Sequence, residues 1–457
     1  MIDVDEAVRL IEQTAMHLPP RRVRLEIAAG GLLAAGVVAD LDSPPWDKAM
    51  MDGFAVTAAD FAGDGAAAEI VELDVVADLA AGDAGSLVVR PGTCVRIMTG
   101  APIPPGAEAV VPIERSVDST AKVHAGGRVR LCEPRFRSGQ HIGRQGDSFR
   151  AGQTVLAKGT RLGPAQVGLA AEAGASHVEL LAPPRVAIIT TGSELVSADT
   201  TPAHGQIRNS NGPMLAAAVA AAAAEPIPLG IAGDRPEPLR AAIAQGLAAD
   251  VLLLSGGVSA GDYDLVPGTL AAAGVEQVFH KVRLKPGKPI WFGVLRREQA
   301  FPTLVFGLPG NPVSTLVCFE LFVRPALAIA AGLPRDSWHR PRLTATLTTE
   351  AKGNPDRPVY HPCTINGSDQ SPTAAPLPWG GSADLLGLSR ANGLLLLPAG
   401  CGQLESGSEV AVIPLECANQ ITPPSANTTG GAGPPRSREP AYADKRSQGR
   451  QSDVGVE

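Results

Sequence analysis

The sequence predicts a multidomain protein in which a central α/β domain, built on a doubly wound parallel sheet, is accompanied by β-rich domains. Two observations support this prediction. Within residues 178–333, short apolar runs alternate with helical stretches, which is typical of βαβ units. On both sides of this region, short alternating runs are broken by Gly (51 residues) and Pro (41 residues), which favours small β domains with tight turns.

Composition limits the classes of function. The 457 residues imply about three domains at roughly 150 residues each, and 44% hydrophobic residues supply several cores. A net charge of −7 and only 4% aromatic residues argue against binding to nucleic acid or to an anionic membrane. Six scattered Cys without a CxxC pair, and acidic residues in place of a signal peptide, lead us to expect a cytoplasmic protein without structural disulfides or zinc.

The N-terminal part combines helical and β patterns. Val4, Ala7, Val8, Ile11 and Ala15 recur at helical spacing and predict a first helix. Residues 41–135 are β-like, with the runs Ser86–Arg90 and Val110–Ile113 as examples. Residues 139–177 are rich in turns and include a predicted short helix over Leu162–Ala175.

The α/β region contains apolar runs that predict strands buried on both faces of a sheet. These predicted strands are Val186–Thr190, Val251–Leu254 and Thr303–Leu308. The predicted helices between and around them are Pro213–Ala224, Pro236–Ala248 and Val266–Ala273. A last helix should begin with Asn311 as N-cap and Pro312 at its first position, and end before Gly332. Residues 338–416 again predict a β domain, and the polar, Pro- and Gly-rich residues 418–457 predict a disordered tail.

Three glycine-bearing loops follow predicted strands of the sheet. They contain Gly192, then Ser255, Gly256 and Gly257, and then Pro309, Gly310, Asn311 and Pro312. Ligands bind beyond the carboxyl ends of the strands in such sheets, and glycines let backbone N–H groups approach phosphate closely. Each loop alone could be an ordinary turn, but three at one sheet edge favour a binding crevice.

A basic segment, residues 281–288, follows the predicted helix Val266–Ala273. Lys281, Arg283 and Lys285 alternate, so in an extended chain they would share one face, and Lys288 follows in a Pro-Gly-Lys-Pro turn. No carboxylate lies between Gln277 and Arg297. The alternative is a solvated edge strand protected by lysines. The rigid turn leads us to favour a site for phosphate or another oxyanion.

Carboxylates near the glycine loops could complement this site. Glu194, Asp234, Asp262 and Asp264 suggest a site for Mg²⁺ together with a phosphate, although each alone could be a helix-end charge. The GxSxG pattern around Ser259 suggests a hydrolase nucleophile, but Ser255-Gly256-Gly257 has already left the strand, and no downstream His has a persuasive context. The P-loop pattern is absent.

Eight sequence blocks in a fixed order resemble the molybdopterin molybdenumtransferases of the MoeA type, which also form the E domain of gephyrin. The resemblance covers about residues 1–416 and rests on Trp46–Val56, Arg96–Pro102 with Gly106–Val111, Gly143–Asp147, Thr190–Leu195, Ser255–Ser259, Lys285–Pro289, Leu308–Pro312 and Ala391–Pro398. It implies an elongated homodimer whose active site lies between the α/β domain of one subunit and the small β domain of the other. It also implies a discontinuous linker domain and a barrel-like C-terminal domain. The expected domains are 1–44 with 136–177, 45–135, 178–334 and 335–416, followed by the tail 417–457.

The resemblance implies the last step of molybdenum cofactor synthesis. Molybdate and adenylylated molybdopterin react in the presence of Mg²⁺, the dithiolene takes up the metal and AMP is released. The family pattern assigns catalytic positions to Asp52, Thr99, Asp147, Glu194, Lys281 and Lys285, with Glu194 and Asp52 as metal ligands. It assigns binding positions to Gly192, Ser255, Gly256, Gly257, Asp234, Asp264, Lys288, Pro309, Gly310, Asn311, Pro312, Arg144 and Ser382.

This sequence departs from the family pattern next to Asp52. Lys48 and Ala49 stand where the family has Asn and Ser, so hydrogen-bonding roles do not carry over to these two positions. Two other functions are compatible with the fold. A non-catalytic scaffold would not need the retained polar set, because buried unpaired charges are costly. A molybdopterin adenylyltransferase, which is also a possible partner, resembles residues 178–333 alone, and the additional β domains argue against this function.

Overall fold

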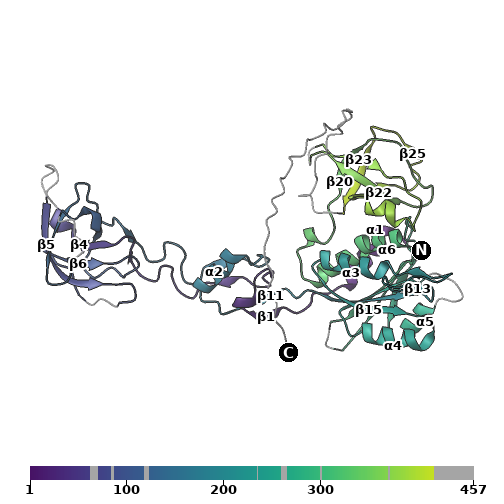
Figure 1. Ribbon diagram of the computed structural model, residues 1–457, viewed down its shortest axis with the longest axis horizontal. Coiled ribbons are helices and arrows are strands. Elements are labelled where there is room, and N and C mark those ends of the chain that lie inside the picture. Colours follow the sequence, from purple (N-terminus) through teal and green to yellow (C-terminus); the bar gives the residue numbers. More distant parts are fainter. Residues whose placement is uncertain are drawn as a thin grey trace, which may run out of the picture.

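The computed structural model describes residues 1–61, 70–83, 87–117, 123–233, 235–258, 265–298, 301–368 and 371–415. The predicted tail, Asp234, Ser259, Asp262 and Asp264 lie outside these described residues. The described chain is elongated, with a small β domain at one end and the α/β and C-terminal domains at the other (Figure 1).

A six-stranded sheet forms the centre of the α/β domain. In spatial order its strands are β15 (Glu225–Ala232), β12 (Arg185–Thr191), β16 (Val251–Ser255), β19 (Thr303–Leu308), β18 (Trp291–Leu295) and β17 (Glu276–His280). The first four strands are parallel. Three of them, β12, β16 and β19, were predicted as strands of a parallel sheet, and β15 was not predicted. The last two are antiparallel to their neighbours, because β17 and β18 are joined by a short loop rather than by a helical crossover. The sheet is therefore mixed.

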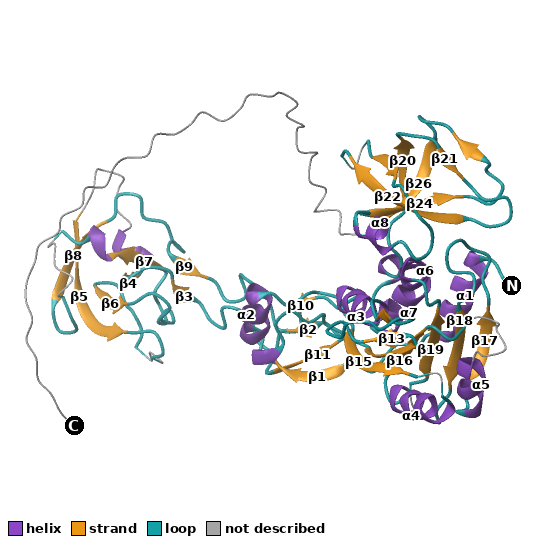
Figure 2. Ribbon diagram, turned by 45° about the vertical axis from the view of Figure 1, so that its right-hand side comes forward, coloured by secondary structure: helices purple, strands orange, loops and turns teal. Residues whose placement is uncertain are grey.

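Helices cover both faces of this sheet because its strands are apolar at consecutive positions. Val186 and Ile188 face one core, whereas Ala187 and Ile189 face the other. The first face carries α1 (Val4–Thr14), α3 (Asn211–Ala221), α6 (Pro312–Cys318) and α7 (Arg324–Ala330). The second face carries α4 (Pro236–Gly246) and α5 (Leu265–Ala272), as Figure 2 shows. The doubly wound arrangement is thus confirmed.

The first helix packs on the α/β domain rather than on the linker that follows it. Val4, Ala7 and Ile11 of α1 belong to the same core as the strands of the large sheet. The domain boundaries predicted from the sequence remain predictions, and this packing places the first residues of the chain beside the α/β domain.

The longest helical stretch is the most buried one. Asn311 precedes α6 and Pro312 occupies its first position, as predicted, and a π-helical turn at Phe319–Val323 continues it into α7. Among the described residues, Pro312–Ala330 is long and apolar enough to cross a membrane, but 89% of its apolar window is buried inside the protein. It is accordingly a core helix of the α/β domain.

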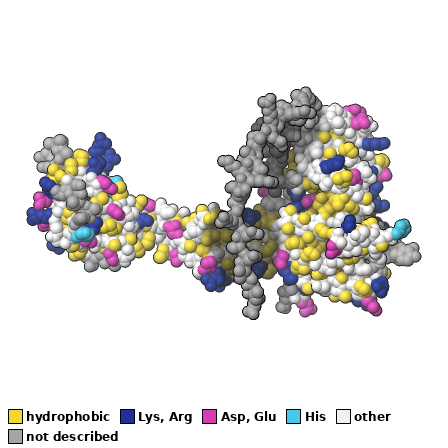
Figure 3. All heavy atoms as spheres, in the orientation of Figure 1, with side chains coloured by type: hydrophobic (Ala, Val, Ile, Leu, Met, Phe, Trp, Pro, Cys, Tyr) yellow, Lys and Arg dark blue, Asp and Glu magenta, His cyan; other side chains and the backbone are white. Residues whose placement is uncertain are grey.

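Two distant segments of the chain form the linker. Strand β1 (Arg21–Arg24) pairs with β11 (His177–Leu180), and β2 (Val37–Val38) pairs with β10 (Thr154–Leu156). Helix α2 (Pro164–Glu172) packs beside them. The space-filling view shows this part as a narrow stalk (Figure 3).

The small β domain contains a five-stranded sheet. Its order is β7 (Ala109–Pro112), β4 (Gly53–Val56), β6 (Thr93–Ile97), β5 (Ile70–Leu79) and β8 (Arg128–Cys132). The expected run at Ser86–Arg90 forms no strand over its described residues, 87–90. Short strands β3 (Lys48–Ala49) and β9 (Ile142–Gly143) pair where this domain meets the linker.

The C-terminal domain is a closed barrel. It contains β20 (Leu343–Leu347), β23 (Thr373–Pro376), β22 (Val359–Asn366), β24 (Gly393–Leu397) and β26 (Glu409–Pro414) in spatial order. The short strands β21 (Ala351–Lys352) and β25 (Gln403–Leu404) pair beside it, and α8 (Leu385–Ser389) packs toward α6. This arrangement brings one edge of the barrel domain next to the glycine loops of the large sheet.

Candidate active site

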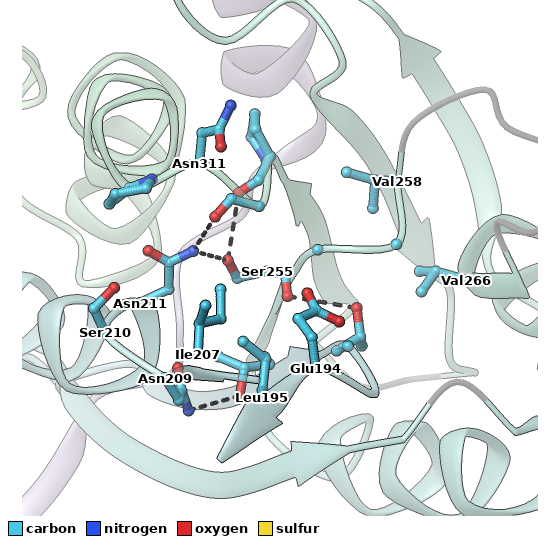
Figure 4. A pocket seen from close by; sticks show the side chains of 18 of the residues that line it. Glu194, Leu195, Ile207, Asn209, Ser210, Asn211, Ser255, Val258, Val266 and Asn311 are labelled. Atoms are coloured by element: carbon cyan, nitrogen blue, oxygen red, sulfur yellow. Dashed lines mark hydrogen bonds between the residues drawn. The ribbon is translucent and has the colours of Figure 1, made fainter. Parts of the chain in front are cut away.

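The carboxyl ends of β12, β16 and β19 open into a cavity of about 900 Å³. Its lining includes the three glycine loops predicted from the sequence, with Gly192, Ser255, Gly256, Gly257, Pro309, Gly310, Asn311 and Pro312. A further wall comes from β13 (Leu195–Val196) and β14 (Ile207–Arg208), which pair in parallel. The structure therefore brings the predicted loops together at one edge of the sheet, and we call this space the first cavity (Figure 4).

Backbone conformation at the second loop requires glycine. Gly256 has φ +95°, and a Cβ atom there would lie 2.5 Å from the carbonyl oxygen of Thr191. Gly257 also has a positive φ, +62°. The main chain thus lies against the neighbouring strand end, as expected where a ligand must approach backbone N–H groups closely.

Asn211 connects two of the loops and was missed by the sequence analysis. Its Nδ2 donates to Ser255 Oγ at 2.8 Å and to the Gly310 carbonyl oxygen at 2.7 Å (Figure 4). A backbone carbonyl can only accept a hydrogen bond, so this contact fixes the orientation of the amide. Asn209 beside it donates to Thr190 Oγ1 at 2.8 Å. The only local signal was the Asn-Ser-Asn sequence just before the predicted helix at Pro213.

Glu194 is the carboxylate that the described residues bring to the first cavity. It follows β12, is exposed, and points toward the loops in Figure 4. Within the described ranges no group of three or more His, Cys, Asp or Glu side chains could hold a metal ion. One carboxylate beside a cavity lined by glycine loops nonetheless fits Mg²⁺, which commonly uses one or two carboxylates together with substrate oxygens.

A second cavity of about 590 Å³ adjoins the first. The two share Pro289, Pro309, Gly310 and Asn311 as lining residues. Three cationic side chains, Lys285, Lys288 and Arg357, line the second cavity, and its described lining includes no carboxylate. Such a surface favours an oxyanion. Arg357 was missed, because nothing in the local sequence of the barrel domain distinguishes it from other arginines.

Backbone pairing positions the lysine segment. The N–H of Lys285 donates to the Pro358 carbonyl at 2.9 Å, and its carbonyl accepts from Tyr360 at 2.8 Å. On the other side, Arg283 N–H donates to the Ile2 carbonyl at 2.8 Å. The segment therefore lies between the N-terminal residues and the barrel domain, and its Lys285 side chain is held at the cavity by main-chain contacts.

Two details of the predicted basic segment differ in the structure. Lys281 has φ +66°, so the extended run is broken there, and Lys281 lines neither cavity. Arg283 is paired with Asp3, with 3.4 Å between Nε and Oδ1. The sequence showed no nearby carboxylate because Asp3, which lies beside Arg283 in the fold, is distant from it in the chain.

The barrel domain contributes one wall of the second cavity. Ser382 lines it, and its Oγ accepts from Asn311 Nδ2 at 2.8 Å, which links the barrel domain to the third glycine loop. Trp379 also lines the cavity, and its indole N–H is buried with no acceptor among the described residues. Burial lowers the pKa of His361, which stacks edge-on against Trp379, and the charge of Lys285 adds to this effect.

Four of the remaining predicted residues form two hydrogen-bonded pairs in and beside the small β domain, and we call these pairs the polar cluster. Asp52 Oδ1 accepts from the N–H of Thr99 at 2.8 Å and from its Oγ1 at 2.7 Å. These two bonds, with the charge of Arg96, hold the pKa of Asp52 below its ordinary value. Asp147 Oδ2 accepts from the Arg144 N–H at 2.8 Å. The predicted residues Asp52 and Thr99 are thus in contact, as are Arg144 and Asp147.

A second carboxylate orders the same cluster. Asp47 accepts from the N–H of Gln145 at 2.9 Å and from Arg144 Nη1 at 2.5 Å, and these bonds hold its pKa below its usual range. Lys48, the departure from the family pattern, lies on β3 opposite Gly143. Its side chain is partly exposed.

In a single chain this polar cluster lies at the opposite end of the molecule from the two cavities, because the linker separates the two parts (Figure 1). One copy of the chain therefore does not bring Asp52 near Glu194. A joint metal site of these two carboxylates would require a second copy, and it remains a prediction, as do the roles of Asp234 and Asp264.

The chain matches three family models in order. Residues 2–174 match the MoeA N-terminal region (domain I and II), residues 187–329 a probable molybdopterin binding domain, and residues 344–415 the MoeA C-terminal region (domain IV).

Individual relatives match over nearly the whole chain. The chain is 37% identical to molybdopterin molybdenumtransferase 2 of Mycobacterium tuberculosis over 423 residues, which cover 90% of this chain and 99% of that protein. It is 33% identical to the molybdopterin molybdenumtransferase of Bacillus subtilis over 419 residues, covering 90% and 94%. The crystal structure of a MoeA protein from Pyrococcus horikoshii superposes with a TM-score of 0.62 at 28% identity, covering 91% of this chain and 100% of that chain. The chain therefore belongs to the MoeA family of molybdopterin molybdenumtransferases.

Proposed function

We propose that this protein is an enzyme of molybdenum cofactor biosynthesis that inserts molybdenum from molybdate into adenylylated molybdopterin, with release of AMP. The observation that carries the proposal is the pair of adjoining cavities at the carboxyl edge of the sheet. One has glycine loops and room for a nucleotide-sized ligand, and the other is cationic. The names of the relatives, which are molybdopterin molybdenumtransferases, support the same activity.

The first cavity suits the adenylylated pterin. Its volume of about 900 Å³ lies in the range of cofactor sites. A pyrophosphate between pterin and adenosine would lie against the backbone of Gly192, Gly256 and Gly257, where close approach of the main chain is possible. The fixed Asn211 amide holds the second and third loops in this arrangement before the ligand arrives.

The second cavity suits molybdate. A dianion binds most favourably where several fixed cations attract it and no carboxylate in the lining repels it. Lys285, Lys288 and Arg357 would contact its oxygens, and Ser382 would add a hydroxyl group. Because the two cavities share a rim, the molybdate would lie next to the pterin nucleotide, which supplies the proximity that a two-substrate reaction needs.

Cleavage of the phosphoanhydride bond releases AMP and increases negative charge on the phosphate oxygens. The Lys285 and Lys288 ammonium groups are placed to stabilise that charge. Mg²⁺, when bound, would neutralise further charge on the same phosphates, and Glu194 is the described residue that would hold it at the first cavity. The protein thus acts mainly by positioning two anionic reactants and stabilising charge.

We also propose that the working enzyme is a homodimer in which a second copy supplies the polar cluster of the small β domain. The support is that Asp52, Thr99, Arg144 and Asp147 are ordered by specific hydrogen bonds, yet lie far from the cavities of their own chain. A carboxylate with a lowered pKa, such as Asp52, remains ionised and could complete the coordination of Mg²⁺.

The direct test is molybdate-dependent AMP release from adenylylated molybdopterin by the purified full chain, with and without Mg²⁺. AMP should appear together with the metal-loaded pterin and only when molybdate is present. AMP release at the same rate with and without molybdate would contradict the proposal. ATP consumption with free molybdopterin would instead indicate the adenylyltransferase activity, and binding without any turnover would indicate a scaffold.

A further inference from the structure

The segment from Trp379 to Leu385, which ends in the first residue of α8, contributes to the lining of both cavities. Trp379, Gly380, Gly381 and Ser382 line the second cavity, and Ala383 and Leu385 line the first. Asp384 lies within this segment but lines neither cavity. Its carboxylate therefore cannot act on a ligand directly and can influence the site only through the loop.

The Asp384 carboxylate accepts two hydrogen bonds, one from a residue later in the chain and one from a residue earlier in the chain. Oδ1 accepts from the N–H of Gly387 at 2.9 Å, which is the ordinary side-chain cap of α8. Oδ2 accepts from the N–H of Gly380 at 2.9 Å. A helix cap requires only the first bond. The second fixes the main chain of the cavity wall four residues earlier.

The same loop is fixed to the α/β domain at Ser382. Asn311 Nδ2 donates to Ser382 Oγ at 2.8 Å, and the N–H of Val313 donates to the Ser382 carbonyl at 3.1 Å. The short wall 380–382 is thus held by Asp384 on one side and by the start of α6 on the other. These contacts fix a wall that lines the second cavity together with Lys285 and Arg357.

We infer that Asp384 is a positioning residue for the oxyanion in the second cavity: it holds the Gly380–Ser382 wall against the cationic side chains and so sets oxyanion affinity without touching the ligand. This inference rests on the proposed function, which places molybdate there. It predicts that the two cavities respond differently to substitution of Asp384, because its bond to Gly380 fixes the wall of the second cavity.

The test is calorimetric titration of the full-length protein with sodium molybdate and, separately, with AMP. Asp384→Ala should weaken molybdate binding by about tenfold, the effect of losing one charged hydrogen-bond acceptor, and should change AMP binding less than about twofold. Asp384→Asn keeps one acceptor oxygen and should lie between wild type and Asp384→Ala. The matched control is Glu350→Ala, which removes an exposed carboxylate of the same domain that bonds only Gln403 among the described residues, and it should leave both affinities unchanged.

Melting temperatures of all variants separate positioning from unfolding. Equal losses of molybdate and AMP affinity in Asp384→Ala, or an unchanged molybdate affinity, would overturn the positioning role while leaving the proposed function intact. Absence of molybdate binding to the wild-type protein would overturn both the placement of molybdate and the role of Asp384. A molybdate-specific loss with partial recovery in Asp384→Asn would establish the inference.

Discussion

Lys285 is the side chain on which the proposed oxyanion site depends most. Its backbone is held on both sides by hydrogen bonds to the barrel domain, whereas its exposed side chain lines the cationic cavity. Lys285→Ala should therefore weaken molybdate binding by about tenfold with little loss of stability, since the main-chain bonds remain. Calorimetry with molybdate and a thermal melt measure the two effects.

The matched control for Lys285 is Lys352→Ala. Lys352 is an exposed lysine of β21 in the barrel domain and lines neither cavity. It should bind molybdate like the wild type. Equal affinities for the Lys285 variant and this control would remove the lysine from the oxyanion site.

Asp52 is predicted to matter for turnover rather than for folding. It is exposed, and among the described residues its carboxylate accepts hydrogen bonds from Thr99 and is influenced by the charge of Arg96. We expect Asp52→Ala to reduce AMP release by at least about a hundredfold, as loss of a charge-stabilising group commonly does, with a melting temperature close to that of the wild type. Undiminished AMP release would exclude Asp52 from the site.

Local sequence was sufficient for some of these residues and not for others. The glycine loops, Lys285 and Lys288 follow strands or lie in a rigid turn, so their positions could be inferred from the chain nearby. Asn211 and Arg357 could not, because their partners, Gly310 and the lysine segment, are distant in sequence. Asn311 was expected as a helix cap, but its side chain instead bonds Ser382 of the barrel domain.

At the scale of elements, the buried ion cluster on the π-helical turn joins the core helix to the barrel domain. Glu320 accepts from Arg324 Nε at 2.5 Å and from Arg340 Nε at 2.6 Å, and only 5% of its side chain is exposed. Burial opposes ionisation of Glu320, but the two arginines outweigh it and lower its pKa. The charged form is therefore the one that the fold stabilises.

This cluster gives the stability of the protein a definite pH dependence. A lowered pKa in the folded state means that the contribution is complete above the unfolded pKa of about 4.5 and is lost as the pH falls through the lower, folded value. We expect Glu320→Gln to lower the free energy of unfolding at pH 7 by about 3–5 kcal/mol, because two partly buried arginines lose their charged partner.

Chemical denaturation between pH 3 and pH 7 measures this effect. The difference in stability between wild type and Glu320→Gln should narrow as the pH falls below about 4.5. A difference that stays constant over this range would show that the carboxylate charge is not what stabilises the junction.

Apolar runs predicted the three inner parallel strands β12, β16 and β19, because each is buried on both faces. The fourth parallel strand, β15, was not predicted, because this edge strand contains two prolines and a glycine and is exposed or only partly buried over most of its length. The antiparallel pair β17 and β18 was not distinguished, since pairing direction depends on the length and course of the connection rather than on apolar content. The break in the extended run at Lys281 was also missed, because no residue type or pattern around this lysine predicts its positive φ.

At the scale of the whole molecule, the linker separates two halves of the proposed active site. If a second copy supplies the small β domain, light scattering of the full chain should give twice the chain mass of 46.9 kDa, about 94 kDa. A stable monomer that is fully active would contradict the shared site.

Mixing two impaired variants, at a molybdate concentration below the dissociation constant of Lys285→Ala, tests the same arrangement by activity. Lys285→Ala changes the cavity part of the proposed site, and Asp52→Ala changes the part that the small β domain supplies. A mixed dimer would therefore contain one site with both defects and one intact site. Co-refolded or co-expressed mixtures should therefore recover AMP release, up to about a quarter of the wild-type value when the chains pair at random. Recovery should be absent when either variant is mixed with itself.

The most direct measurement is the position of bound tungstate, a heavy analogue of molybdate, located by its anomalous signal in crystals of the full-length protein. The account predicts one strong peak in the second cavity, within contact of Lys285, Arg357 and Ser382 and beside the loop that contains Gly310. A peak elsewhere on the protein, with this cavity free of tungstate, would contradict the assignment of neighbouring sites to the two reactants.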